Sequence, residues 1–251
     1  MPVAALQNWL ADLEKRHLSD LTFAEVSRAL RALSSAYVER RETLACGSAL
    51  NGAGKRAAFA LFYGPLHFLL LDAIARALQI AGAGTDAVVD LGCGTGAAGA
   101  ALATATAAAR VIGIDRSQWA LDEARSTYRQ FGLKSILRRG DVTLRRPPAD
   151  RATIVAAYVL NEIPDKQREA LLSQLVARAG RGDRVLIVEP IAVSVAPWWA
   201  RWEEKVRAAG GRADVWRFPV ELPAIVGKLD RAAGLDHREL TGRTFWLDGA
   251  R

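Results

Sequence analysis

The stretch from Val88 to Gly99 constrains the fold of this chain most, because it predicts a strand, a glycine-rich turn and a helix in immediate succession. An apolar, β-branched run ends in Asp90, glycines follow at 92, 94 and 96, and alanine-rich sequence comes next. Glycine permits such a turn because it adopts positive φ and lets a ligand approach the backbone. The first amides of the following helix are then free to donate to that ligand.

Two acidic residues bear on which ligand the turn binds. Gly94, Gly96 and Gly99 also satisfy the G-x-G-x-x-G dinucleotide pattern, which alone is a weak signal. Asp90, however, would repel a pyrophosphate and suits an ammonium group. Asp115 ends the next predicted strand, about 20 residues after the glycines, where a carboxylate accepts the hydroxyls of a ribose. An ammonium group and a ribose together indicate S-adenosylmethionine.

The segments Asp90-Leu-Gly-Cys-Gly-Thr-Gly96 and Ile112-Gly-Ile-Asp115 resemble motif I of class I methyltransferases and the segment that follows it. This resemblance implies an α/β, Rossmann-like fold whose seven-stranded sheet has its last strand antiparallel, with S-adenosylmethionine as the cofactor. We expect the glycines and Asp90 to lie around the methionine part, Asp115 on the ribose and Asp141 near the adenine. We expect no metal site. The full set of predicted cofactor-binding residues is Asp90, Gly92, Cys93, Gly94, Gly96, Asp115, Arg116, Asp141, Val142 and Tyr158.

The segment after the fourth predicted strand, Thr153 to Tyr158, supplies the candidate catalytic residues. Ligands of open α/β sheets bind beyond the carboxyl ends of the strands, so Tyr158, Asn161 and Glu162 are expected to face a methyl acceptor. Glu162 is the candidate base and Asn161 the candidate orienting group. The alternative is that either residue merely caps the helix predicted to begin near Pro164. We expect His67 to be a packed core histidine rather than a base.

Periodicity divides the chain into a helical N-terminal extension, residues 1–81, and a methyltransferase domain, residues 82–251. In the extension, Thr22 and Glu25 have the spacing of a capping box. Residues 191–220 are expected to be an aromatic insert, in which Trp198 and Trp202 pack in the core while Trp216 and Phe218 are candidates for ligand contact. Two short strands, 237–240 and 243–247, are expected to form a terminal hairpin.

Composition limits the setting and the partners of the protein. The two cysteines, Cys46 and Cys93, cannot build a disulfide framework, so we expect a reducing, cytoplasmic setting. The apolar stretch from Phe59 to Leu71 is too short to span a bilayer, and we expect no membrane partner. A net charge of +7 favours a polyanionic partner, above all RNA.

A narrower resemblance concerns Ala157 to Asp165 and Val185 to Pro190, together with the arginine-rich helical N-terminal region. These segments are similar to a methyltransferase-like family that assists small-ribosomal-subunit assembly in mitochondria and occurs in bacteria. The resemblance implies ribosomal RNA or a small-subunit intermediate as the acceptor, although this chain lacks the several cysteines with which members of that family often bind a metal cluster. Two alternatives stay open: a small-molecule methyltransferase with an aromatic-lined pocket, and a non-catalytic assembly factor that binds the cofactor.

Overall fold

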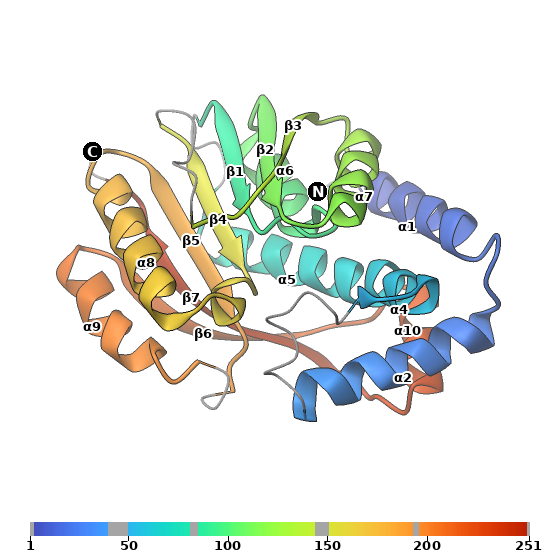
Figure 1. The fold of residues 1–251 in the computed structure, drawn as a ribbon. Helices are drawn as coiled ribbons and strands as arrows, with labels where there is room; N and C mark the ends of the chain where they lie inside the picture. Colours follow the sequence, from blue (N-terminus) through green and yellow to red (C-terminus); the bar gives the residue numbers. More distant parts are fainter. Residues whose placement is uncertain (1–2, 40–49, 81–84, 144–150, 193–195, 250–251) are drawn as a thin grey trace.

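The computed structural model describes residues 3–39, 50–80, 85–143, 151–192 and 196–249 (Figure 1). Seven strands form one sheet in the order β3-β2-β1-β4-β5-β7-β6. The first five strands run parallel, and β7 pairs antiparallel with both β5 and β6. The predicted α/β, Rossmann-like fold with a reversed last strand is therefore confirmed. The strands are β1 (Ala87–Leu91), β2 (Arg110–Asp115), β3 (Lys134–Arg139), β4 (Thr153–Ala157), β5 (Arg184–Glu189), β6 (Arg212–Pro219) and β7 (Glu239–Leu247).

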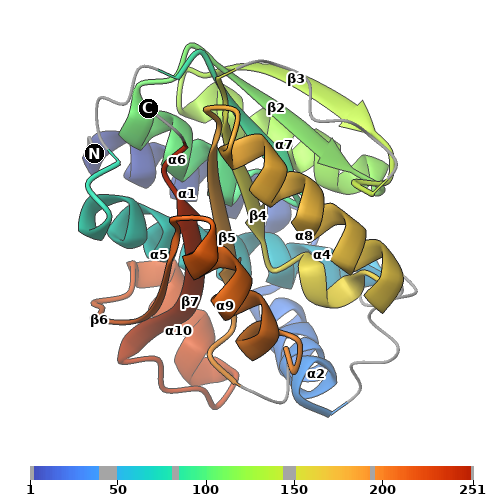
Figure 2. The same cartoon turned by 90° about the vertical axis from the view of Figure 1, so that its left-hand side faces the viewer.

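Alternation along the strands builds two apolar layers, one on each side of the sheet. Val88 and Val155 contribute to one layer, whereas Val89 and Ile154 contribute to the other. The first layer is covered by α1 (Val3–His17), α2 (Phe23–Glu39), α4 (Ala53–Ala58), η2 (Phe59–Tyr63), α5 (Gly64–Ala77), α6 (Ala97–Thr106), α7 (Gln118–Gln130) and α10 (Ala224–Ala232). The second is covered by α8 (Asp165–Ala179) and α9 (Trp199–Ala208), as Figure 2 shows.

The N-terminal helices share the core of the sheet. On α1, the Trp9 indole donates to the Thr127 hydroxyl at 3.2 Å, and Arg16 pairs with Glu123 at 2.9 Å. The predicted capping box before α2 is confirmed. The Thr22 amide donates to the Glu25 carboxylate at 2.8 Å, and the Glu25 amide donates to the Thr22 hydroxyl at 3.3 Å. The expected domain boundary near residues 81–82 lies outside the described residues, and the division of the chain stays a prediction.

One helical run, Ala53–Ala77, crosses the first face of the sheet without a break. The run contains a π-helical turn, Phe59–Tyr63, which is followed by α5 with Pro65 in its first turn. By length and composition the run is long enough to cross a membrane, but most of it is buried inside the protein, as in a core helix.

Two expectations about the C-terminal part were wrong. Residues 239–247 form one continuous strand, β7, rather than a hairpin that turns at Thr241-Gly242. One of its two antiparallel partners is β6, which lies within the expected insert. Part of that segment therefore belongs to the sheet. Gly242 sits in the strand because a Cβ there would lie 3.1 Å from Leu70 on α5. The glycine therefore permits close packing of the helix instead of making a turn.

Candidate functional site

The glycine turn between β1 and α6 has the backbone conformation that its sequence predicts. Gly92, Gly94 and Gly96 have φ angles of 68°, 50° and 82°, a region that side chains disfavour. The Gly92 amide donates to the Ile114 carbonyl at 2.9 Å, which fixes the turn on β2. A Cβ on Gly92 would lie 2.4 Å from Val159, whereas one on Gly94 would meet no atom within 4 Å among the described residues. The turn is therefore closed toward β4 at Gly92 and has free space at Gly94.

Asp90 lies beneath this turn and is 1% exposed. Its Oδ2 atom accepts the Gly99 amide at 2.8 Å and the Tyr128 hydroxyl at 3.2 Å. Its Oδ1 atom is buried and has no hydrogen-bond partner in the part of the chain that the structure describes. Burial raises the pKa of Asp90 to about 7. One oxygen of Asp90 thus holds α6 and α7, and the other stays available as an acceptor.

Asp115 joins the turn to the next helix. One carboxylate oxygen accepts the Gly94 amide at 2.9 Å, and the other accepts the Ser117 amide at 2.8 Å. Ser117 in turn caps α7 by accepting the Ala120 amide at 3.3 Å. Each oxygen of Asp115 has a second lone pair, and the residue is only partly buried. The carboxylate is therefore held in place while it can still accept a ligand hydroxyl.

The Cys93 side chain belongs to the buried core. Its sulfur would lie 3.0 Å from a Cβ placed on Gly113 of β2. Burial raises the pKa of the Cys93 thiol well above its usual value. Only the backbone of Cys93 belongs to the turn. Cys46 lies outside the described residues.

The predicted adenine side is built around Asp141, which follows β3. Its carboxylate accepts the Thr143 amide at 2.8 Å and forms an ion pair with Arg116 at 3.3 Å. Burial acts to raise the pKa of Asp141, but the hydrogen bonds from Thr143 and the charge of Arg116 outweigh it and hold the pKa below its usual value. The neighbouring Val142 is buried. Asp115, Arg116 and Asp141 are thus brought together where β2 and β3 end.

At the end of β4, Tyr158 adopts a φ angle of 59°, which is rare for a residue with a side chain. Its amide donates to the Val188 carbonyl at 2.9 Å, and its ring stacks on His67 with the ring centroids 4.3 Å apart. Burial lowers the pKa of His67 to about 4, so the imidazole is neutral at pH 7. His67 packs on a tyrosine, as expected.

Asn161 and Glu162 follow in the 3-10 turn η3 (Leu160–Glu162), and they differ in environment. The Asn161 side-chain amide donates to Glu189 and accepts the Trp198 indole at 3.1 Å. Glu162 is exposed, yet partial desolvation raises its pKa to about 7, and the charge of Asp115 acts in the same direction. Neither residue caps α8, because Pro164 occupies the N-cap position. The capping alternative was therefore wrong.

Glu189, at the end of β5, was not assigned a role from the sequence. It is fully buried, and it accepts the Leu160 amide at 3.0 Å together with the side-chain amide of Asn161. Burial raises the pKa of Glu189 to about 8, although the charge of Arg243 opposes this shift. The available signal was an acid at a strand end, the pattern that singled out Asp90 and Asp115.

The aromatic residues of the expected insert pack against the protein itself. Trp198 and Trp202 are buried in the second core layer, as predicted. Trp216 and Phe218 lie on β6 and pack against the first layer, and the Trp216 indole donates to Thr244 at 2.9 Å. These two rings therefore pack against the protein where β6 pairs with β7, and their contact with a ligand stays a prediction.

Comparisons with known proteins agree with this geometry. Residues 88–181 match the family of methyltransferase domains. The matched part begins in β1 and includes the glycine turn, Asp115, Asp141 and Glu162. No curated protein sequence is significantly similar to the chain.

Solved structures with a similar fold include three methyltransferases. The mitomycin 7-O-methyltransferase MmcR has 16% identity and a TM-score of 0.52, with 88% of this chain and 68% of that chain covered. NcsB1 is an O-methyltransferase from neocarzinostatin biosynthesis, solved in complex with S-adenosylmethionine and 2-hydroxy-5-methyl naphthoic acid. It has 21% identity and a TM-score of 0.50, with 98% of this chain and 74% of that chain covered. PH1948 from Pyrococcus horikoshii, a candidate RNA methyltransferase, has 18% identity and a TM-score of 0.45, with 73% and 84% covered.

The likenesses to MmcR and NcsB1 support the fold described above. Together with the family match, they support S-adenosylmethionine as the cofactor of the methyltransferase domain. The roles of the individual site residues and the similarity to the ribosomal assembly family stay predictions.

Proposed function

We propose that this chain transfers the methyl group of S-adenosylmethionine to an acceptor bound beyond the carboxyl ends of β1 and β4. The observation that supports this most is the arrangement at Gly94. Its amide is held by Asp115, and its α-carbon faces free space. The orphaned oxygen of Asp90 lies beneath the same turn. A cationic amino acid group and a ribose fit these two acids, while a pyrophosphate beside Asp90 would be repelled.

The remaining residues fit the other parts of this ligand. Asp141 and the buried Val142 would contact the adenine, and Arg116 fixes the Asp141 carboxylate. When bound, the cofactor supplies an electrophilic methyl group. Glu162 accepts the proton of the acceptor, since its pKa of about 7 suits a general base at neutral pH. Asn161, held between Glu189 and Trp198, orients the acceptor. We also propose a cytoplasmic location, which the buried free thiol of Cys93 supports.

Calorimetric titration tests the donor site. We expect micromolar binding of S-adenosylmethionine, no binding of NAD, and at least tenfold weaker S-adenosylmethionine binding in Asp115→Ala. Asp115→Asn separates charge from shape, because the amide keeps one acceptor oxygen. Asp122→Asn is the matched control, since Asp122 is an exposed acid on α7 that bonds only to neighbours on its own helix in the described structure. Binding of NAD, or no loss in Asp115→Ala, would contradict the proposal.

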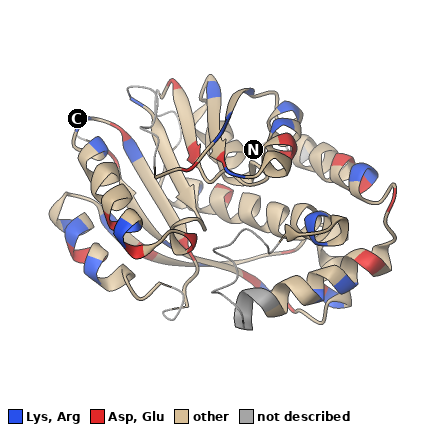
Figure 3. Cartoon of the chain, in the orientation of Figure 1, with Lys and Arg blue, Asp and Glu red and all other residues tan. Residues whose placement is uncertain are grey.

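Ribosomal RNA or a small-subunit intermediate is one candidate for the methyl acceptor. It is supported by the net charge of +7 and by exposed arginines on α2, namely Arg28 and Arg31. Figure 3 shows the basic residues spread over several helices. Filter binding of a small-subunit RNA fragment at several salt concentrations tests this candidate, because phosphate contacts make the affinity fall steeply with salt. A salt-independent affinity would contradict it.

A non-catalytic cofactor-binding factor predicts a different result. In that case Glu162→Gln and Asn161→Ala would leave any measured methyl transfer unchanged while the cofactor still bound.

A further inference from the structure

Four aromatic rings form a row beside the glycine turn, and of these only Tyr158 was predicted from the sequence to contact the cofactor or the acceptor. Phe59 and Tyr63 lie on η2, His67 on α5 and Tyr158 just after β4. Ring centroids are 5.7 Å apart for Phe59 and Tyr63, 6.2 Å for Tyr63 and His67, and 4.3 Å for His67 and Tyr158. All four side chains are only half-buried. We call these four residues the aromatic wall.

The aromatic wall lies next to the glycine turn. Gly64, the first residue of α5, faces Thr95 of the turn so closely that a Cβ on Gly64 would lie 3.3 Å from the Thr95 hydroxyl. The other end of the wall, Tyr158, follows the last residue of β4. Ligands of open α/β sheets bind beyond these strand ends. The wall therefore runs along the place where an acceptor would meet the methyl group.

The local backbone indicates that this position is specialised. The π-helical turn Phe59–Tyr63 interrupts an otherwise α-helical run, and such turns occur frequently at functional sites. Tyr158 is held at a positive φ angle, and strained residues of this kind also concentrate at functional sites. Two separate departures from regular backbone thus present adjoining rings of one wall.

At its Tyr158 end the wall lies beside acidic groups, whereas Lys55 and Arg56 precede Phe59 by one helical turn at its other end. Glu189 acts electrostatically on Tyr158, and Asp115 acts on Glu162. Of the basic residues described at this edge, Arg116 is paired with Asp141, and Arg243 lies over the Trp199 ring and faces Glu189. Once these acids are ionised, a phosphate or carboxylate would therefore be repelled at the Tyr158 end of the wall, whereas a neutral or cationic ring would not.

We propose that the aromatic wall binds the methyl acceptor, and that the acceptor is a small, flat aromatic molecule, neutral or cationic, with a hydroxyl or amine as its nucleophile. This inference rests on the proposed methyl transfer. The acceptor oxygen or nitrogen forms the new bond to the methyl carbon. The sulfur–methyl bond breaks with its electron pair remaining on sulfur, and Glu162 takes the proton of the acceptor.

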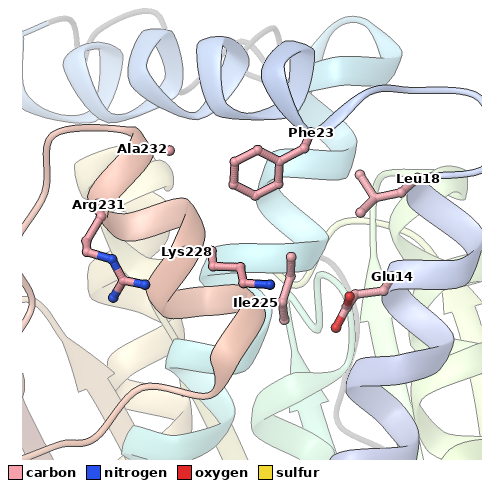
Figure 4. A pocket seen from close by; sticks show the side chains of 7 residues that line it. All are labelled: Glu14, Leu18, Phe23, Ile225, Lys228, Arg231 and Ala232. Atoms are coloured by element: carbon pink, nitrogen blue, oxygen red, sulfur yellow. The ribbon is translucent and has the colours of Figure 1, made fainter.

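A groove elsewhere in the molecule supplies the control. A groove of about 720 Å³ is lined by Glu14, Leu18, Phe23, Ile225, Lys228, Arg231 and Ala232 (Figure 4). These residues come from α1, α2, α10 and the α1–α2 connection, and none comes from the sheet. Phe23 is 37% exposed there, so Phe23→Leu removes an accessible ring away from the aromatic wall.

The test measures binding of three probes by ligand-observed NMR and calorimetry, with and without S-adenosylmethionine. 2-Naphthol is the neutral ring, 2-naphthoate the same ring with a negative charge, and a single-stranded RNA oligonucleotide the polyanion. We expect 2-naphthol to bind about tenfold more tightly than 2-naphthoate, because the acids repel the carboxylate. In Phe59→Leu and Tyr63→Leu, 2-naphthol binding should weaken about fivefold through loss of ring contacts. Phe23→Leu should bind 2-naphthol like the unchanged protein, and all three variants should keep their S-adenosylmethionine affinity.

The outcomes separate this inference from the donor proposal. Equal 2-naphthol binding by the wall variants and the Phe23 control, or tighter binding of 2-naphthoate, would overturn the aromatic site even where S-adenosylmethionine binds. RNA binding that the wall variants abolish would assign the wall to a nucleic acid instead. If S-adenosylmethionine failed to bind, the donor proposal would fall. The probe titrations without cofactor would then still decide whether the wall is a binding site.

Discussion

Replacing Tyr128 by phenylalanine tests how the buried acid beneath the glycine turn is supported. Tyr128 is fully buried on α7, and its hydroxyl donates to Asp90 at 3.2 Å. Its ring lies against the turn, since a Cβ on Gly96 would be 3.1 Å away from it. Tyr128→Phe keeps this packing and removes one of the two donors to the Asp90 carboxylate.

The expected loss follows from the charge of the acceptor. A hydrogen bond to a charged buried group contributes about 1.5–3 kcal/mol, so Tyr128→Phe should lower the free energy of unfolding by about 2 kcal/mol at a pH where Asp90 is ionised in both proteins. For a chain of 251 residues this corresponds to a fall in Tm of about 4–8 °C.

The sign of the pH dependence follows from the raised pKa. Asp90 has a pKa of about 7 in the folded protein, against a reference value of 3.8, so the folded state binds more protons between these values. Its contribution to stability is therefore largest at low pH and decreases as the pH rises through this window. Without the Tyr128 hydroxyl the pKa of Asp90 rises further. The difference between the variant and the unchanged protein should then be small at pH 5, should reach roughly 1 kcal/mol at pH 8, and should be complete only above the pKa of Asp90 in the variant.

Urea unfolding followed by circular dichroism at pH 5 and pH 8 measures this difference. Tyr63→Phe is the matched control, because the Tyr63 hydroxyl bonds to the neutral Ser34 and its loss should not depend on pH in this range. If Tyr128→Phe destabilised the protein equally at both pH values, the hydroxyl would not be serving a carboxylate that ionises near neutrality.

Three further predictions concern the turn and the acceptor side. Gly92→Ala places a Cβ 2.4 Å from Val159 at a φ angle of 68°, so cofactor binding should be lost, with partial recovery on adding Val159→Ala; calorimetry checks both. Glu162→Gln should flatten a methyl-transfer rate that otherwise rises through about pH 7, while S-adenosylmethionine affinity, measured in parallel, stays unchanged. Asn161→Ala removes a donor to the buried Glu189 and should lower stability by about 1–3 kcal/mol in urea unfolding.

Local signals sufficed for the first half of the sheet. The apolar run into Asp90, the spaced glycines and the acid at Asp115 predicted β1, the turn and β2, because a parallel strand buried on both faces is a short apolar run. The start of α7 is fixed by a similarly local contact, since the capping hydroxyl of Ser117 acts within its own first turn. In these places the interaction that fixes the structure lies within a few residues.

The C-terminal half was harder because its structure depends on distant partners. In β6 exposed residues alternate with partly buried ones, and its pairing with β7 joins segments more than 20 residues apart. Gly242 suggested a turn, although it serves the approach of Leu70 from α5. Similarly, no sequence pattern links Asn161 to Glu189 and Trp198, because three separate elements bring them together.

The acids at the ends of β2 and β5 and one residue before the end of β1 look alike in the sequence, but their surroundings give them different tasks. Asp115 is partly exposed with both oxygens fixed by backbone amides, which suits a ligand-facing acceptor. Asp90 and Glu189 are buried and have raised pKa values of about 7 and 8, and they hold neighbouring elements. Since Glu162 also has a pKa of about 7, methyl transfer should increase between pH 6 and 8 for two separable reasons. Ionisation of Asp90 strengthens binding of the cationic cofactor and changes its Kd, whereas ionisation of Glu162 supplies the base and changes kcat. A pH profile of kcat that survived Glu162→Gln unchanged would place the proton acceptor elsewhere.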